Sequence, residues 1–119
     1  MTNANIIEVT TETFEEDVLN HTGPVLVAFY AQWCEPCSQL APVITSIAQQ
    51  FTGRLRIARL DVDADDELAN LFGIQSVPSL KLIIGGQLLG DWTGLVPEEL
   101  LAGGINTALE LAANRTSAS

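Results

Sequence analysis

The most informative part of the sequence is residues 25–37, which read VLVAFYAQWCEPC. Its first six residues are apolar or aromatic without alternation, a pattern typical of a central β-strand buried on both faces. Cys34 and Cys37 follow at once, where a helical pattern begins. Cysteines at this spacing can close a small disulfide ring. A helix N-terminus lowers the pKa of an adjoining thiol, because its free N–H groups and its dipole stabilise the thiolate. The segment predicts a redox-active pair.

The two cysteines are expected to have different roles. Cys34 precedes the first helical turn, so we expect its sulfur to be the more exposed one and to act as the nucleophile. Cys37 lies one turn into the helix, where it is shielded and can resolve a mixed disulfide. Pro36 suits the first helical turn, and Trp33 is expected to frame the sulfurs.

Metal binding and inert burial are alternative roles for the cysteine pair, and both stay open at this point. A CxxC pair can form half of a zinc site, but the chain has only these two cysteines and one histidine, His21. The pair can also be two inert buried thiols. Redox chemistry is the interpretation that the position at a strand end and helix start favours.

The pattern outside this segment predicts alternating strands and helices. Gly85-Gly86 separates two strand-like runs and predicts a hairpin, because two glycines allow the positive φ angles of a tight turn. Gly103-Gly104 lies within the last helical pattern and indicates either a close helix–sheet contact or a bend. The expected strands are 6–9, 25–30, 55–60, 79–84 and 87–93. Four helices are expected: from Thr11 or Thr13 to about Asn20, from near Cys34 to about Phe51, from a cap at Asp65 or Asp66 to about Phe72, and from Pro97 to about Leu111. Thr13 and Glu16 have the spacing of a capping box.

Length and charge restrict the function. A chain of 119 residues fits one domain (1–119), with a core over about 6–111 and a flexible tail over 112–119. The net charge of −10 argues against binding to nucleic acid or anionic membranes. No apolar run approaches a membrane span, and the N-terminus lacks a signal sequence, so a cytoplasmic location is expected.

Several separated motifs resemble the thioredoxin family. The stretch 27–37 resembles its active-site strand and loop, and Pro42 matches a proline in the family's second helix. Residues 72–79, FGIQSVPS, resemble the approach to the family's cis-proline, while Gly86 and Gly94 match two further glycines. The combination of WCxPC with VPS is specific, whereas CxxC alone is not. The resemblance covers about residues 6–111.

The resemblance implies an α/β thioredoxin fold, with a mixed five-stranded sheet flanked by four helices. It implies that Val77–Pro78 is a cis bond facing the cysteines and that this loop pairs with an extended substrate strand. With Cys34 and Cys37 as catalytic residues, the implied substrate-binding residues are Trp33, Glu35, Pro36, Val77, Pro78 and Gly94. Disulfide-containing proteins would be the substrates and a thioredoxin-type reductase would restore the dithiol. No cofactor or metal is expected beyond the disulfide, and the chain is expected to be a monomer.

The sequence departs from the family at several positions near the site. Ala28 stands where the family usually has a buried aspartate that moves a proton to or from the inner cysteine, so exchange is expected to be slower near neutral pH and the domain more stable. Glu35 replaces a glycine. Its carboxylate either raises the pKa of Cys34 and makes the pair more reducing, or is simply solvated. Tyr30 and Ser38 replace a common tryptophan and lysine, which indicates atypical partners.

Two functions follow from these residues. The first is an enzyme that reduces protein disulfides by dithiol–disulfide exchange. The alternative is a binding module with the same fold and slow or vestigial redox activity, which Ala28 and Glu35 leave open.

Overall fold

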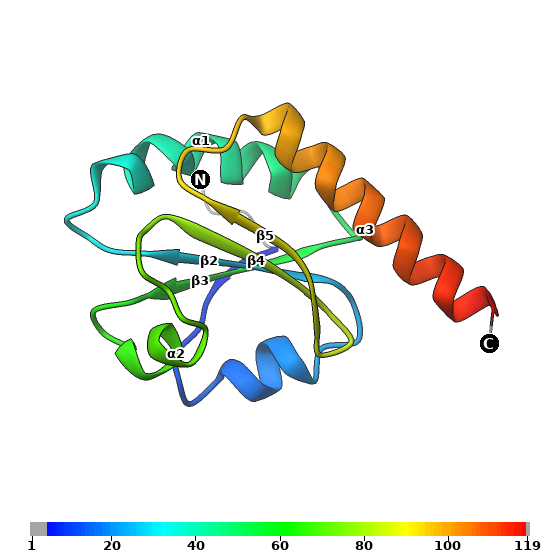
Figure 1. The fold of residues 1–119 in the computed structure, drawn as a ribbon, viewed down its shortest axis with the longest axis horizontal. Helices are drawn as coiled ribbons and strands as arrows, with labels where there is room; N and C mark the ends of the chain where they lie inside the picture. Colours follow the sequence, from blue (N-terminus) through cyan, green and yellow to red (C-terminus); the bar gives the residue numbers. More distant parts are fainter. Residues whose placement is uncertain (1–4, 119) are drawn as a thin grey trace.

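The computed structural model describes residues 5–118, in which a five-stranded sheet is covered by helices on both faces (Figure 1). This confirms the predicted fold class. The elements in chain order are β1 (Ile6–Glu8), η1 (Glu15–Leu19, a short π-helix), β2 (Val25–Tyr30), α1 (Glu35–Gln50), β3 (Arg56–Asp61), α2 (Asp66–Leu71), β4 (Ser79–Ile84), β5 (Gln87–Thr93) and α3 (Glu98–Ala118).

The strands lie in the order β1-β3-β2-β4-β5. β1 and β2 both pair with β3 in parallel, as strands joined by helical crossovers do. β4 pairs antiparallel with β2, and β5 antiparallel with β4. β2, the strand that leads to Cys34, therefore lies in the centre of the sheet, where strands on both sides hold its carboxyl end in place.

Two layers of apolar side chains fix the sheet between the helices. On one face α1 and α3 pack through Ile47, Leu101 and Ile105, all fully buried, against β2 residues such as Leu26. On the other face η1 and α2 contribute Val18 and Leu68, which pack against Phe29 of the same strand. The uninterrupted apolar run of β2 is thus explained, because its side chains enter both layers.

The β4–β5 hairpin forms as predicted. Gly85 and Gly86 have φ angles of 59° and 78°, which any residue with a side chain adopts only rarely. Lys81 Nζ lies 2.9 Å from Asp91 Oδ1 on the opposite strand. The pair lies beyond a register shift between Leu82 and Ile83, so it supports the shifted register of this part of the hairpin.

Gly104 marks a close contact between α3 and the sheet. A Cβ atom placed on Gly104 would lie 2.6 Å from Cζ2 of Trp92, and one placed on Gly90 would lie 2.6 Å from Cη2 of the same ring. The indole of Trp92 therefore occupies the space that side chains at both glycines would need. Gly103 has open space around its Cα atom. The sequence indicated either a close helix–sheet contact or a bend at this glycine pair. The structure has the close contact, and Gly104 makes it.

Neither Thr13 nor Asp65 caps a helix with its side chain, although Asp65 occupies the predicted N-cap position of α2. Thr13 Oγ1 accepts a hydrogen bond from the Thr10 N–H at 2.9 Å, so it closes a turn instead of forming a capping box with Glu16. Asp65 occupies the cap position of α2, but its carboxylate accepts from the N–H and the hydroxyl of Thr11. Thr13 thus closes a local turn, whereas Asp65 joins the start of α2 to the segment before η1.

The remaining boundaries differ slightly from the prediction. β3 begins and ends one residue later, and β1 stops at Glu8. Pro97 lies before α3, because its carbonyl accepts the first helical bond from Leu101 N at 3.0 Å.

α3 continues beyond Leu111 to Ala118, where a tail was expected, since neither glycine nor proline interrupts this alanine-containing stretch. Ser119 lies outside the described residues. Within residues 5–118, none of the helices combines the length and apolar character that a membrane crossing requires.

Candidate active site

Cys34 and Cys37 are joined by a disulfide at the N-terminus of α1, with their Cα atoms 5.3 Å apart. Cys34 is the N-cap residue of the helix, and its Sγ accepts a hydrogen bond from the Cys37 N–H at 3.1 Å. A helix N-terminus leaves such N–H groups without helical partners, so one of them is directed at this sulfur. The Cys34 sulfur is therefore the one that the helix end stabilises as a thiolate.

The relative exposure of the two cysteines is the reverse of the prediction. Cys34 is 3% exposed, whereas Cys37 is partly exposed. Cys34 is covered because its Sγ lies 3.6 Å from the Val77 carbonyl oxygen, so the loop before β4 rests on it. The position of a residue along a helix does not reveal which loop from elsewhere in the chain will cover it.

The loop that covers Cys34 contains Val77 and Pro78. Their peptide bond is cis, as the resemblance implied. The Pro78 carbonyl accepts from Gly94 N at 2.9 Å, and Gly94 has a φ of 84°, which favours glycine. The tight turn at Gly94 thus places the end of β5 beside the loop that covers Cys34.

The remaining predicted site residues surround this junction. Trp33 is 72% exposed, and its Nε1 donates a hydrogen bond of 2.7 Å to Asp63 Oδ2 in the turn after β3. Glu35 and Pro36 are exposed in the first turn of α1. Asp63 had no role in the sequence-based prediction. The parallel pairing of β2 with β3 could have indicated it, because the two strands end at the same edge.

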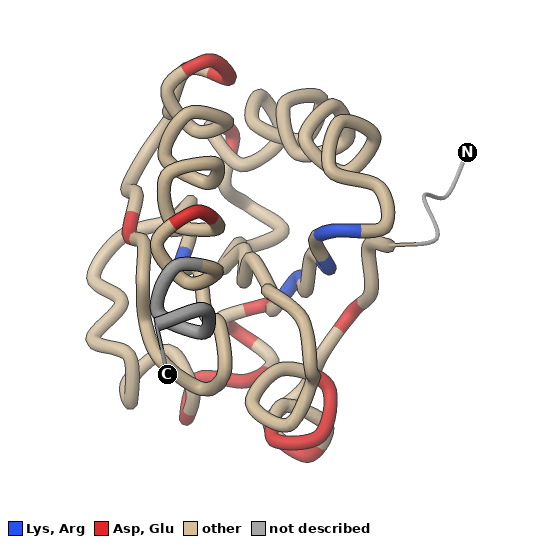
Figure 2. Tube along the Cα trace, turned by 90° about the vertical axis from the view of Figure 1, so that its right-hand side faces the viewer, with Lys and Arg blue, Asp and Glu red and all other residues tan. Residues whose placement is uncertain are grey.

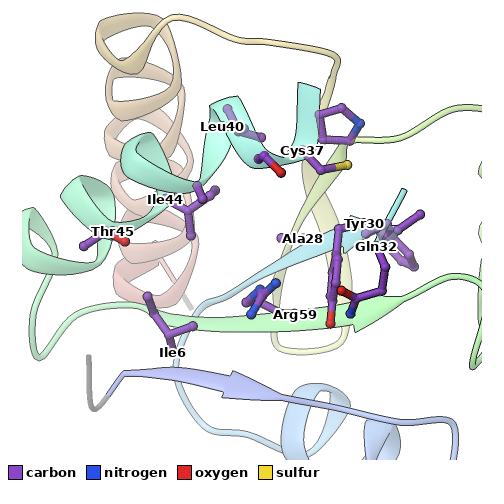
Figure 3. A pocket seen from close by; sticks show the side chains of 14 residues that line it. Ile6, Ala28, Tyr30, Gln32, Cys37, Leu40, Ile44, Thr45 and Arg59 are labelled. Carbon is purple, nitrogen blue, oxygen red and sulfur yellow. The ribbon is translucent and has the colours of Figure 1, made fainter. Parts of the chain in front are cut away.

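A pocket of about 360 Å³ lies beside the disulfide, between α1 and the sheet (Figure 3). Cys37 and Ala28 line it, together with Leu40, Ile44, Arg59 and other residues. The Ala28 side chain is a single methyl group at the position where the family has an aspartate. No carboxylate side chain occurs among the described residues that line the pocket.

Arg59 is held at this pocket by two neighbours. Its Nη1 lies 3.0 Å from Glu8 Oε1, and its guanidinium lies 4.2 Å from the ring centre of Tyr30. The Tyr30 hydroxyl donates to Glu8 Oε2 at 3.1 Å. Partial burial and the Glu8 carboxylate raise the pKa of Tyr30 above its ordinary value. The sequence did not indicate this group, because it depends on the register of β1, β3 and β2.

The chain as a whole is acidic, with a net charge of −10. Figure 2 shows acidic positions distributed over the chain and the basic positions gathered in its middle. Arg56 and Arg59 belong to β3, with Arg54 just before it, while Lys81 lies on β4. Among residues 5–118 no cluster of three or more metal-ligating side chains occurs.

A cysteine pair that caps a helix beside a proline loop can, once reduced, exchange with a disulfide of another molecule through a thiolate. This arrangement defines the chain as a dithiol–disulfide oxidoreductase of the protein-disulfide reductase class. The family model described as "Thioredoxin" matches residues 5–107. The chain therefore belongs to the thioredoxin family.

Individual relatives agree with this assignment. Thioredoxin 1 of Nostoc sp. is 40% identical over 95 residues, which are 80% of this chain and 89% of the relative. The thioredoxin of Synechocystis sp. is 41% identical over 95 residues, with the same two shares. The thioredoxin of Pseudomonas aeruginosa is 35% identical over 98 residues, 82% of this chain and 91% of the relative.

Proposed function

We propose that the chain reduces disulfides of partner proteins with Cys34 as the nucleophile and Cys37 as the resolving residue. In the reduced protein the Cys34 thiolate attacks a substrate disulfide and forms a mixed disulfide, while one substrate thiolate leaves. The Cys37 thiolate then attacks the Cys34 sulfur, so the second substrate thiolate leaves and the Cys34–Cys37 disulfide forms. The two electrons pass from the cysteine pair to the substrate.

The hydrogen bond from Cys37 N to Cys34 Sγ is the observation that carries these roles. It favours the thiolate on Cys34 over that on Cys37, because an ionised sulfur accepts a stronger bond than a neutral one. Burial of Cys34 beneath Val77 requires that the substrate enters beside this loop.

The substrate is proposed to bind along the loop of Val77 and Pro78. Support comes from the Val77 carbonyl, which lies beside the nucleophile, and from the backbone bond between Pro78 and Gly94. An extended peptide can pair with such a loop as an added strand. Trp33, Glu35 and Pro36, all exposed, complete the proposed contact surface.

Replacement of Cys37 by serine tests the assigned roles. The variant is expected to attack insulin disulfides through Cys34 and to stop at the mixed disulfide, because no thiol remains to resolve it. Mass spectrometry after quenching with acid should show one insulin chain bound to the protein. The matched variant Cys34→Ser should show none. An adduct of equal yield on Cys37 in the Cys34→Ser variant would contradict the assignment.

Ala28→Asp is expected to speed exchange several-fold near neutral pH. Ala28 and Cys37 line the same pocket, so a carboxylate at residue 28 can take up the proton of the Cys37 thiol. Burying the carboxylate should lower the free energy of unfolding by about 1 kcal/mol. Stopped-flow reduction of insulin and denaturant unfolding measure the two effects, with Ala28→Asn as the control that cannot ionise. Equal exchange rates in the Asp and Asn variants would refute proton transfer by residue 28.

The partners and location proposed for the chain follow from its family and its charge. A thioredoxin-type reductase restores the dithiol, and the disulfide replaces a bound cofactor or metal as the carrier of electrons. The net charge of −10 supports a protein that binds neither nucleic acid nor anionic membranes. A cytoplasmic monomer is the proposed form.

A further inference from the structure

Glu35 carries a charge between the two reacting cysteines. It lies in the first turn of α1, one residue after Cys34, and it is exposed. Among residues 5–118, no hydrogen-bond donor or cation contacts its carboxylate. The fold therefore leaves this charge available to a molecule that approaches Cys34.

The basic side chains of the sheet do not neutralise Glu35, because each is bound to an acceptor elsewhere in the fold. These pairs are Arg56 with the Asp17 carbonyl, Arg59 with Glu8, and Lys81 with Asp91. The register of β2 and β3 also places Arg56 opposite Val25, at the end of the sheet remote from Cys34. Arg54 precedes β3 at that same end, with its guanidinium 4.9 Å from the ring centre of Phe51.

Trp33 offers a cation a second contact on the other side of Cys34. The indole is 72% exposed, and its Nε1 already donates to Asp63 Oδ2 at 2.7 Å. The face of an exposed indole attracts an ammonium or guanidinium group, because its π electrons give it a negative potential. Cys34 thus has an aromatic side chain one residue before it and a carboxylate one residue after it, and both favour a cation.

We propose that Glu35 selects substrates, so that the chain reduces disulfides flanked by Lys or Arg faster than disulfides flanked by Asp or Glu. The inference rests on the proposed function and names the class of substrate that it favours. Substrate residues next to the attacked sulfur come close to the first turn of α1 when Cys34 attacks, because only a few covalent bonds join them to that sulfur. At such distances unlike charges attract and like charges repel, which changes the rate of attack.

The first experiment compares three synthetic peptides that differ only in the residue beside each of their two disulfide-bonded cysteines. That residue is lysine, glutamine or glutamate. The pre-reduced chain is mixed with excess peptide and quenched with acid, and chromatography measures the reduced peptide. Each rate is divided by the rate of the same peptide with dithiothreitol, which corrects for the effect of the charge on the disulfide itself.

The corrected rate of the lysine peptide is expected to exceed that of the glutamate peptide about tenfold, with the glutamine peptide between them. Equal corrected rates would overturn the inference and leave the proposed function intact. If the chain reduced none of the peptides, the proposed function itself would fail, and the inference with it.

The second experiment assigns the selection to one carboxylate. In Glu35→Gln the ratio of the lysine rate to the glutamate rate should fall about fivefold, and in Glu35→Lys it should drop below one. The ratio compares two peptides with the same protein, so any change in the pKa of Cys34 cancels. An unchanged ratio in Glu35→Gln would refute the role of Glu35.

Glu110→Gln is the matched control, because it removes the same charge at a distance from the site. Glu110 is exposed on the C-terminal half of α3, which Figure 1 shows on the opposite side of the molecule from the start of α1. This variant should keep the ratio of the unaltered chain. An equal fall in Glu35→Gln and Glu110→Gln would assign the preference to net charge and overturn the proposal.

Salt gives an independent measurement of the same selection. The ratio for the unaltered chain should approach one in about 1 M sodium chloride, where charges are screened beyond about 3 Å. The ratio for Glu35→Gln should change much less. A preference that persisted undiminished in high salt would not come from the Glu35 charge.

Discussion

Replacing Cys34 by serine is expected to reduce insulin-disulfide reduction to the rate of the reductant alone. Serine cannot form the thiolate that starts exchange, and its oxygen cannot form the mixed disulfide. The variant keeps the helix N-terminus, the Val77–Pro78 loop and Cys37. The Cys37 thiol, however, does not receive the N–H hydrogen bond that Cys34 Sγ accepts. Precipitation of the insulin B chain under dithiothreitol measures the effect. Retention of a large part of the activity would favour a nucleophilic Cys37.

The substitution also removes the disulfide, so its effect on folding must be measured separately. The unaltered chain, Cys34→Ser and Cys37→Ser are compared under reducing conditions, in which none of them has the disulfide. Similar denaturant midpoints would assign the lost activity to the missing thiolate. The same assay tests the alternative of a binding module, because a module without redox function would show no activity in the unaltered chain.

The parts of the structure that depend on local sequence could be predicted. The glycine pair 85–86 fixes a hairpin because its φ angles are positive, and the strands on either side, 79–84 and 87–93, have the predicted bounds. The position of Cys34 and Cys37 at a strand end and helix start follows from the apolar run before them. The cis bond at Pro78 came only from the family resemblance, since a single X-Pro pair is a weak signal.

The features that depend on distant contacts could not be predicted. The Asp65 carboxylate looked like a side-chain cap of α2, but it accepts a hydrogen bond from Thr11, which is 54 positions away. The exposure of Cys34 depends on a carbonyl 43 positions away. Arg59 lies at the pocket because β3 pairs with β2 in a register that places it opposite Ala28. A pattern of apolar and polar residues identifies strands, but it does not specify which side chains meet across them.

Gly104→Ala is expected to lower the free energy of unfolding, although alanine is the better helix former. The added methyl would lie 2.6 Å from Cζ2 of Trp92, closer than two carbon atoms can approach. The indole cannot move away towards the sheet, because Gly90 lies against the opposite end of the ring. A Cβ atom placed on Gly90 would lie 2.6 Å from Cη2 of Trp92. Overpacking of this kind costs about 1–3 kcal/mol, with a middle value of about 2 kcal/mol that exceeds the gain of about 0.5–1 kcal/mol in helix propensity.

Gly103→Ala is the matched control, because it lies one residue away on the same helix with nothing within 4 Å of its Cβ position. It should raise the free energy of unfolding by about 0.5–1 kcal/mol through helix propensity alone. Urea unfolding of both variants measures the difference. Trp92→Leu combined with Gly104→Ala should remove the clash, so the alanine then costs less than it does in the unaltered chain. If both glycine variants were stabilised equally, the indole would be mobile enough to yield, and Gly104 would not be required for the contact between α3 and the sheet.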